Sequence, residues 1–215
     1  RPRRPGRWPA RRRLPAGVAG ELGHAAAALL ALLALSNVDV LLARHYLTAR
    51  DAGLYAVGSV LAKGAFWAPQ FIIVLLFPAL AAGRRAPGVL RRGLSLVVGL
   101  GAVVTLGAAV LGRPVVRTLF GARYTGIAGI AWLFAALGAT LAIAQLLLYS
   151  SLAVESRLAG LLVWLALAAE VVAIATIRHG SAAAIVSVAL ASAAAVVLAS
   201  LVTQRSRSTG HAGAT

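Results

Sequence analysis

Six apolar stretches, separated by short loops that contain arginine, account for most of this chain. Each stretch is close to or longer than the roughly 20 residues that a helix needs to cross a bilayer. Inside a bilayer every backbone polar group must find a partner within the protein, so stretches of this length predict helices. The sequence therefore predicts an all-α, polytopic membrane protein, a bundle of about six transmembrane helices, with spans at about residues 22–47, 52–82, 93–111, 127–150, 158–177 and 181–202.

The composition supports a membrane protein and excludes several kinds of site. Of the 215 residues, 60% are hydrophobic and 12% are charged, whereas about 25% of the residues in a soluble domain are charged. The chain contains no cysteine, which excludes a disulfide framework and thiol chemistry. The four histidines are scattered, without the spacing of metal ligands. We therefore expect neither a metal nor a cofactor.

The placement of arginine predicts the orientation of the chain. The formal net charge is +16, but the basic residues lie at the chain ends and between apolar stretches, where they meet lipid headgroups rather than nucleic acid. Fourteen arginines fall on one predicted side of the membrane and six on the other. The positive-inside rule then places both termini in the cytoplasm.

Three segments differ in composition. Residues 1–20 combine seven arginines with four prolines and predict a basic cytoplasmic linker. Residues 21–203 form the predicted transmembrane lobe, and residues 204–215 a polar cytoplasmic tail without regular structure. Within the lobe, residues 112–126 are amphipathic and are expected to lie at the membrane interface. Since no methionine opens the chain, we expect it to be a piece of a longer polypeptide.

Two opposite charges lie inside consecutive predicted spans, Asp39 and Lys63. A charge at the centre of a membrane helix costs roughly 2.5–3.5 kcal/mol on the mildest scale, so such residues face the protein interior or each other. At about 1.5 Å per residue, Asp39 lies roughly 12 Å and Lys63 roughly 16 Å from the same membrane face. We expect a salt bridge between them. In the alternative, each side chain finds a different partner, or Lys63 extends along its stem toward water.

Lys63, Trp67 and Gln70 are spaced to share one stripe of a continuous helix. This stripe predicts the lining of a wet cavity that receives a sugar or a phosphate. The alternative is a contact with another part of the protein. Asn37 and Asp39 are two positions apart, so we expect at most one of them to face the same wall as Lys63.

Glu170 is a third charge inside a predicted span, with no cation at its depth. A buried carboxyl of this kind could carry a proton, which makes Asp39 and Glu170 candidates for ion coupling. The alternative is a neutral, hydrogen-bonded structural residue. Gln145 and Tyr149 are expected to be interface anchors. Two converging groups, such as Asp39 and Lys63, would also suit acid–base catalysis, although the chain shows no catalytic motif.

Short motifs resemble one superfamily of membrane carriers. An Asn-x-Asp in the first span is followed by a short turn and a Gly-x-Tyr that opens the next helix. This pattern is similar to the start of a lobe in the multidrug/oligosaccharidyl-lipid/polysaccharide exporter superfamily, and most of all in its polysaccharide-biosynthesis flippase branch. The motifs are Asn37-Val38-Asp39, Gly53-Leu54-Tyr55, Leu76-Phe77-Pro78 and Leu119-Phe120-Gly121-Ala122-Arg123-Tyr124.

The resemblance implies the C-terminal lobe of a two-lobe transporter in the bacterial inner membrane, whose N-terminal lobe lies elsewhere in the polypeptide or in a partner subunit. It implies that the protein flips a lipid-linked oligosaccharide by alternating access, without being an enzyme. The implied cavity lining is Asn37, Asp39, Lys63, Trp67 and Gln70. The alternatives are a proton- or sodium-coupled multidrug exporter of the same superfamily, a membrane-embedded glycan- or lipid-transfer enzyme, and a non-catalytic partner subunit.

Overall fold

The computed structural model of the chain describes residues 16–70, 74, 87–152, 157–177 and 180–212. All regular structure in these residues is helical, which confirms the predicted fold class. Most of the predicted linker and most of residues 71–82 of the second predicted span lie outside the described residues. The elements are α1 (Ala16–Leu35), α2 (Val38–Tyr46), α3 (Ala49–Trp67), α5 (Pro87–Phe120), the 3-10 helix η1 (Ala122–Ile130), α6 (Ala131–Leu152), α7 (Arg157–Thr176) and α8 (Ala182–Ala212).

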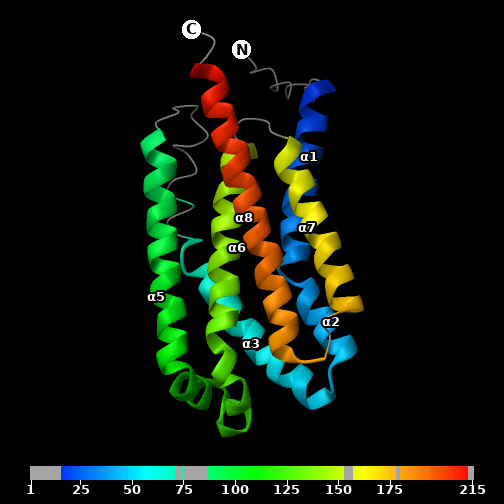
Figure 1. Cartoon of the computed structure of the whole chain (residues 1–215), viewed down its shortest axis with the longest axis vertical. Coiled ribbons are helices and arrows are strands. Elements are labelled where there is room, and N and C mark those ends of the chain that lie inside the picture. The colour runs from blue at the N-terminus through cyan, green and yellow to red at the C-terminus, as the bar shows by residue number, and fades with distance from the viewer. Residues whose placement is uncertain (1–15, 71–73, 75–86, 153–156, 178–179, 213–215) are drawn as a thin grey trace, which may run out of the picture.

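The helices form an elongated bundle (Figure 1). The first turns of α1 and the last turns of α8 lie at one end of it, and the turn between α2 and α3 lies at the other. In the described part of the chain, five stretches are long and apolar enough to cross a membrane. Helix α3, which carries Lys63, is not among them, and most of the rest of the second predicted span lies outside the described residues. The five stretches are Gly20–Tyr46, Leu90–Phe120, Ala122–Leu152, Leu158–Thr176 and Ala182–Gln204.

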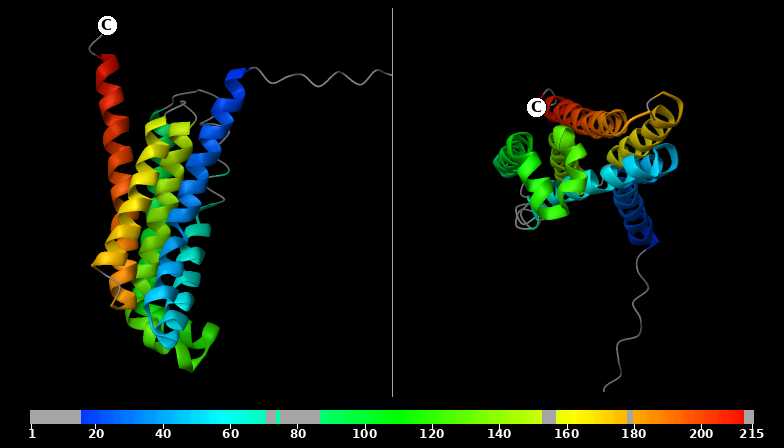
Figure 2. Two further views of the ribbon diagram at one scale, coloured as in Figure 1. Left: turned by 90° about the vertical axis from the view of Figure 1, so that its right-hand side faces the viewer. Right: turned by 90° about the horizontal axis from the view of Figure 1, so that it is seen from below.

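Helix α6 lies at the centre of the bundle, between α5, α3 and α8 (Figure 2). Glycines allow two of these contacts. A methyl group at Gly138 would overlap the carbonyl oxygen of Ala62 in α3, and one at Gly101 of α5 would lie 2.8 Å from Cβ of Ala139. Lipid provides little hydrophobic driving force between helices, so close packing of small residues must hold them together.

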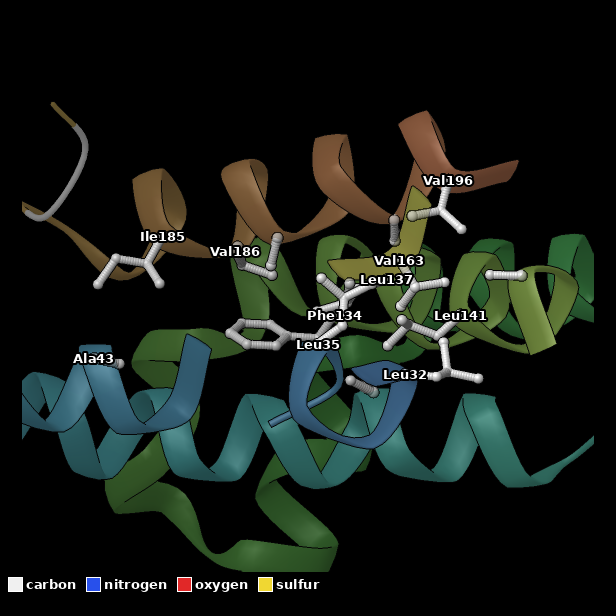
Figure 3. Close-up of a cluster of buried hydrophobic side chains, with 14 of the residues drawn as sticks. Leu32, Leu35, Ala43, Phe134, Leu137, Leu141, Val163, Ile185, Val186 and Val196 are labelled. Atoms are coloured by element: carbon white, nitrogen blue, oxygen red, sulfur yellow. The ribbon is translucent and has the colours of Figure 1, made fainter. Parts of the chain in front are cut away.

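All of the described helices contribute to the main cluster of buried side chains. Leucines of α1 face α6, and branched side chains of α7 and α8 close the cluster (Figure 3). Most of the outward-facing residues of α5 are exposed apolar side chains, which suits contact with lipid. The labelled members of the cluster are Leu32, Leu35, Ala43, Phe134, Leu137, Leu141, Val163, Ile185, Val186 and Val196.

Two boundaries differ from the prediction. Helix α5 continues through Pro114 to Phe120, so residues 112–120 are not a separate interfacial segment. The buried Val116 side chain keeps this part against the bundle, while Arg113 and Arg117 are exposed. Gly121, with φ of 96°, then reverses the chain into η1. At the other end of the lobe, α8 is helical as far as Ala212, so most of the expected tail has regular structure.

Candidate functional site

The first predicted span is broken in the middle. Helix α1 ends at Leu35 and α2 starts at Val38. The backbone N–H of Asn37 donates to the Ala34 carbonyl, three residues back instead of four. The Leu33 carbonyl therefore lacks its usual backbone partner in the helix. Two side chains replace that partner, because Ser36 Oγ and Asn37 Nδ2 donate to Leu33 O at 2.9 and 2.8 Å. These two residues make the break tolerable inside a membrane.

A cleft of about 170 Å³ lies beside this break, between α1–α2, α3 and α6. Asn37, Asp39 and Lys63 all line it. The expectation that only one of Asn37 and Asp39 faces the wall of Lys63 is therefore wrong. That expectation assumed a continuous helix with 100° between successive residues, and the break between α1 and α2 removes this relationship. The full lining is Leu33, Ser36, Asn37, Asp39, Ser59, Ala62, Lys63, Phe66, Trp67, Leu137 and Leu141.

Asp39 is bound by a tyrosine instead of by Lys63. Its side chain is 3% exposed, and its Oδ2 accepts a hydrogen bond from the Tyr55 hydroxyl at 2.7 Å. Its Oδ1 has no hydrogen-bond partner among the described residues. Lys63 is exposed and lies within electrostatic reach of Asp39, but no ion pair joins the two side chains. The expected salt bridge is therefore absent from this structure.

Trp67 lies on one stripe of α3 with Lys63, and both line the cleft, but Gln70 does not. Trp67 is 63% exposed at the cleft, at the last residue of α3. The turn at Ala68 and Pro69 follows, so Gln70 points elsewhere. Its Nε2 donates to Oε1 of Gln145 in α6 at 2.6 Å.

Gln145 and Tyr149 form a polar connection inside the bundle. Gln145 is buried, and its Nε2 donates to the Tyr149 hydroxyl at 2.8 Å. Gln145 therefore packs between helices and does not serve as the interface anchor that we expected. A hydrogen-bonded chain of this kind stabilises contacts between membrane helices.

Glu170 is fully buried in α7, and both of its carboxyl oxygens lack a hydrogen-bond partner among the described residues. Asp39 and Tyr55 lie within its electrostatic reach, and Ser192 of α8 is nearby. The fold thus brings the two carboxyls of the first and fifth predicted spans into one buried region. Whether they couple transport to an ion stays a prediction.

A second hollow, of about 410 Å³, separates α2 from α3 near the opposite end of α2 from the break. Small residues of α3 and the exposed Arg44 line it. Among the residues that the structure describes, no three His, Cys, Asp or Glu side chains are grouped as metal ligands. The expected lack of a metal remains a prediction.

No family model matches this chain, and comparisons with curated proteins and with solved structures find no match either. The resemblance to the exporter superfamily consequently rests on the sequence motifs alone.

Sequence reasoning missed Tyr55 as part of the site. Its signal was present, because a buried tyrosine in an apolar helix usually needs a partner for its hydroxyl. The Gly53-Leu54-Tyr55 motif contains it, and Asp39 is the partner. The roles of Ser36 and Asn37 in the helix break depended on a bend that the apolar pattern does not reveal.

Proposed function

We propose that this protein is one lobe of a transporter that flips a lipid-linked oligosaccharide across the bacterial inner membrane. The observation that carries the proposal is a helix broken at mid-length beside Asp39, Asn37 and Lys63 in one cleft. Broken helices near the bilayer midplane form the substrate and ion sites of many secondary transporters, which work by alternating access. The proposal needs no covalent chemistry, and both termini face the cytoplasm in it.

Three of the cleft residues suit parts of such a substrate. The exposed ammonium of Lys63 attracts the anionic phosphate that links the lipid to the glycan. Trp67 offers an exposed indole ring on which a sugar packs. Asn37 adds an amide at the cleft wall.

The size of the cleft supports a second lobe. Its volume of about 170 Å³ is smaller than the ~300–1,000 Å³ of ordinary ligand pockets. An oligosaccharide needs still more room. In the proposal, an N-terminal lobe in the same polypeptide or in a partner subunit forms the opposite wall.

A multidrug exporter of the same superfamily is the second candidate, and the buried carboxyls favour it. Asp39 Oδ1 and both oxygens of Glu170 lack hydrogen-bond partners in the described part of the chain. Carboxyls held in this way inside a membrane serve as proton or ion carriers. In either candidate, Asp39 and Glu170 are the proposed coupling residues.

The test is translocation in vesicles that are reconstituted with this lobe together with the second lobe of the proposal. A fluorescent lipid-linked oligosaccharide is placed in both leaflets, and movement is followed with a membrane-impermeant quencher. We expect Lys63→Gln to slow flipping about tenfold, the loss of roughly one charge-assisted contact, and Lys63→Arg to retain most of it. Equal rates with protein, with Lys63→Gln and with empty vesicles would reject the flippase proposal.

The same vesicles distinguish the second candidate. An exporter would expel a fluorescent cationic drug under an ion gradient, and Asp39→Asn would stop that export. A protein that moves the drug and leaves the lipid-linked oligosaccharide in place would favour the exporter.

A further inference from the structure

Tyr55 is held rigidly inside the bundle. Its side chain is fully buried in α3, and its ring packs edge-to-face on Phe134 of α6 with 5.0 Å between the ring centroids. Gly58, one turn further along α3, leaves room for the Phe134 ring, because a methyl group there would overlap it. The position of the Tyr55 hydroxyl is thus determined by packing between α3 and α6.

Asp39 has three polar or charged neighbours, of which Tyr55 and Lys63 can serve as partners of its carboxylate. The Tyr55 hydroxyl donates to Oδ2, while Lys63 and Glu170 lie within electrostatic reach without a bond to it. Lys63 shares the cleft with Asp39, and an ammonium is the partner that a buried carboxylate would otherwise take. In the structure the carboxyl is instead hydrogen-bonded to Tyr55.

We infer that Tyr55 is a positioning residue whose hydroxyl keeps the Asp39 carboxyl from pairing with Lys63. The Lys63 ammonium is then free to bind an anionic group in the cleft. The functional part of this inference rests on the proposed function, in which Lys63 attracts a phosphate. The structural part does not depend on it. Without the hydroxyl, both oxygens of Asp39 lack a donor, and the carboxyl turns toward Lys63.

The chain contains one lysine, so an amine-reactive reagent reports on Lys63 directly. The purified protein in detergent is treated with an acylating reagent, and the rate is read by mass spectrometry from the peptide that contains Lys63. Only the neutral amine reacts, and a carboxylate beside an ammonium keeps it protonated. We expect Tyr55→Phe to slow the labelling of Lys63 about tenfold. Tyr124→Phe removes a hydroxyl from η1, outside the cleft lining, and should leave the rate unchanged.

Asp39→Asn, alone and together with Tyr55→Phe, completes a double-mutant cycle. In the wild-type background it should change the labelling rate less than about twofold, because Tyr55 already holds the carboxyl, whereas in the Tyr55→Phe background it should restore the fast rate. A wild-type rate in Tyr55→Phe overturns the inference. So does a several-fold acceleration by Asp39→Asn alone, which remains informative if Tyr55→Phe does not fold.

Translocation assays separate this inference from the proposed function. If both hold, Tyr55→Phe raises the KM for the lipid-linked oligosaccharide about tenfold with little change in the maximal rate. If labelling responds as expected and no variant or wild-type protein flips the lipid, the positioning role stands and the flippase proposal fails. If flipping depends on Lys63 while labelling ignores Tyr55, the positioning role fails alone.

Discussion

Gly138 of α6 lies directly against the backbone carbonyl of Ala62 in α3, with no room between them for a methyl group. Ala62 lines the cleft that also contains Asp39 and Lys63. The contact between these two small residues therefore determines how closely α3, which carries Lys63, approaches α6 at the centre of the bundle.

Gly138→Ala should lower the free energy of unfolding by about 1–3 kcal/mol, because the overlapping atom is backbone and cannot turn aside. Unfolding of the purified protein in a denaturing detergent measures this. Gly99→Ala is the matched control: its site in α5 is open, so stability should stay the same or rise by up to ~1 kcal/mol. Equal stability of the two variants would contradict the close approach.

Ser36 and Asn37 should act redundantly at the helix break. Either side chain alone still donates to the Leu33 carbonyl. Each single change to alanine should then cost less than about 0.5 kcal/mol, and the double change about 1–3 kcal/mol, the penalty of a carbonyl left without a donor inside a membrane. The same unfolding titration measures all three variants. Strictly additive losses would show that the two bonds do not share one acceptor.

Gln145 should contribute more to stability than Gln70. Gln145 makes two side-chain hydrogen bonds, to Gln70 and to Tyr149. Interhelical hydrogen bonds in membranes contribute about 0.6 kcal/mol on average and up to ~1.7. Gln145→Leu should therefore destabilise the fold more than Gln70→Leu does. The double variant should recover part of the sum, because it leaves no glutamine unpaired. Full additivity in the unfolding free energies would argue against the bond between them.

Glu170→Leu should stabilise the fold and abolish ion coupling. Both carboxyl oxygens are buried, and none of the residues that the structure describes forms a hydrogen bond with them. Replacing the group with an apolar one of similar size should therefore raise the unfolding free energy by about 1–3 kcal/mol. Ion-driven transport in vesicles should then stop. Glu21→Leu, at an exposed site in α1, should change neither quantity. A less stable Glu170→Leu protein would mean that the carboxyl has a partner.

The long apolar spans followed from the sequence because bilayer thickness and backbone hydrogen bonding act on each segment separately. The burial of Asp39 and Glu170 also followed from the sequence, because exposing either carboxylate to lipid costs free energy in any fold. The depth argument correctly placed Asp39 and Lys63 near one another, and both line one cleft. Residues 112–120 were misassigned because Pro114 and two arginines interrupt the apolar pattern, while the buried Val116 keeps the helix on the bundle.

Amino-acid order alone determined a helical bundle in a membrane with charged groups at its centre. The partners of those groups were decided by tertiary structure. The two-residue break after Leu35 brings Asn37 and Asp39 to the same wall, and the turn at Ala68 and Pro69 directs Gln70 to Gln145. Packing of the Tyr55 ring against Phe134 places the Tyr55 hydroxyl where it donates to Asp39. Each of these outcomes depends on a local bend or on a contact between helices distant in sequence, and helical periodicity holds only within one unbroken helix.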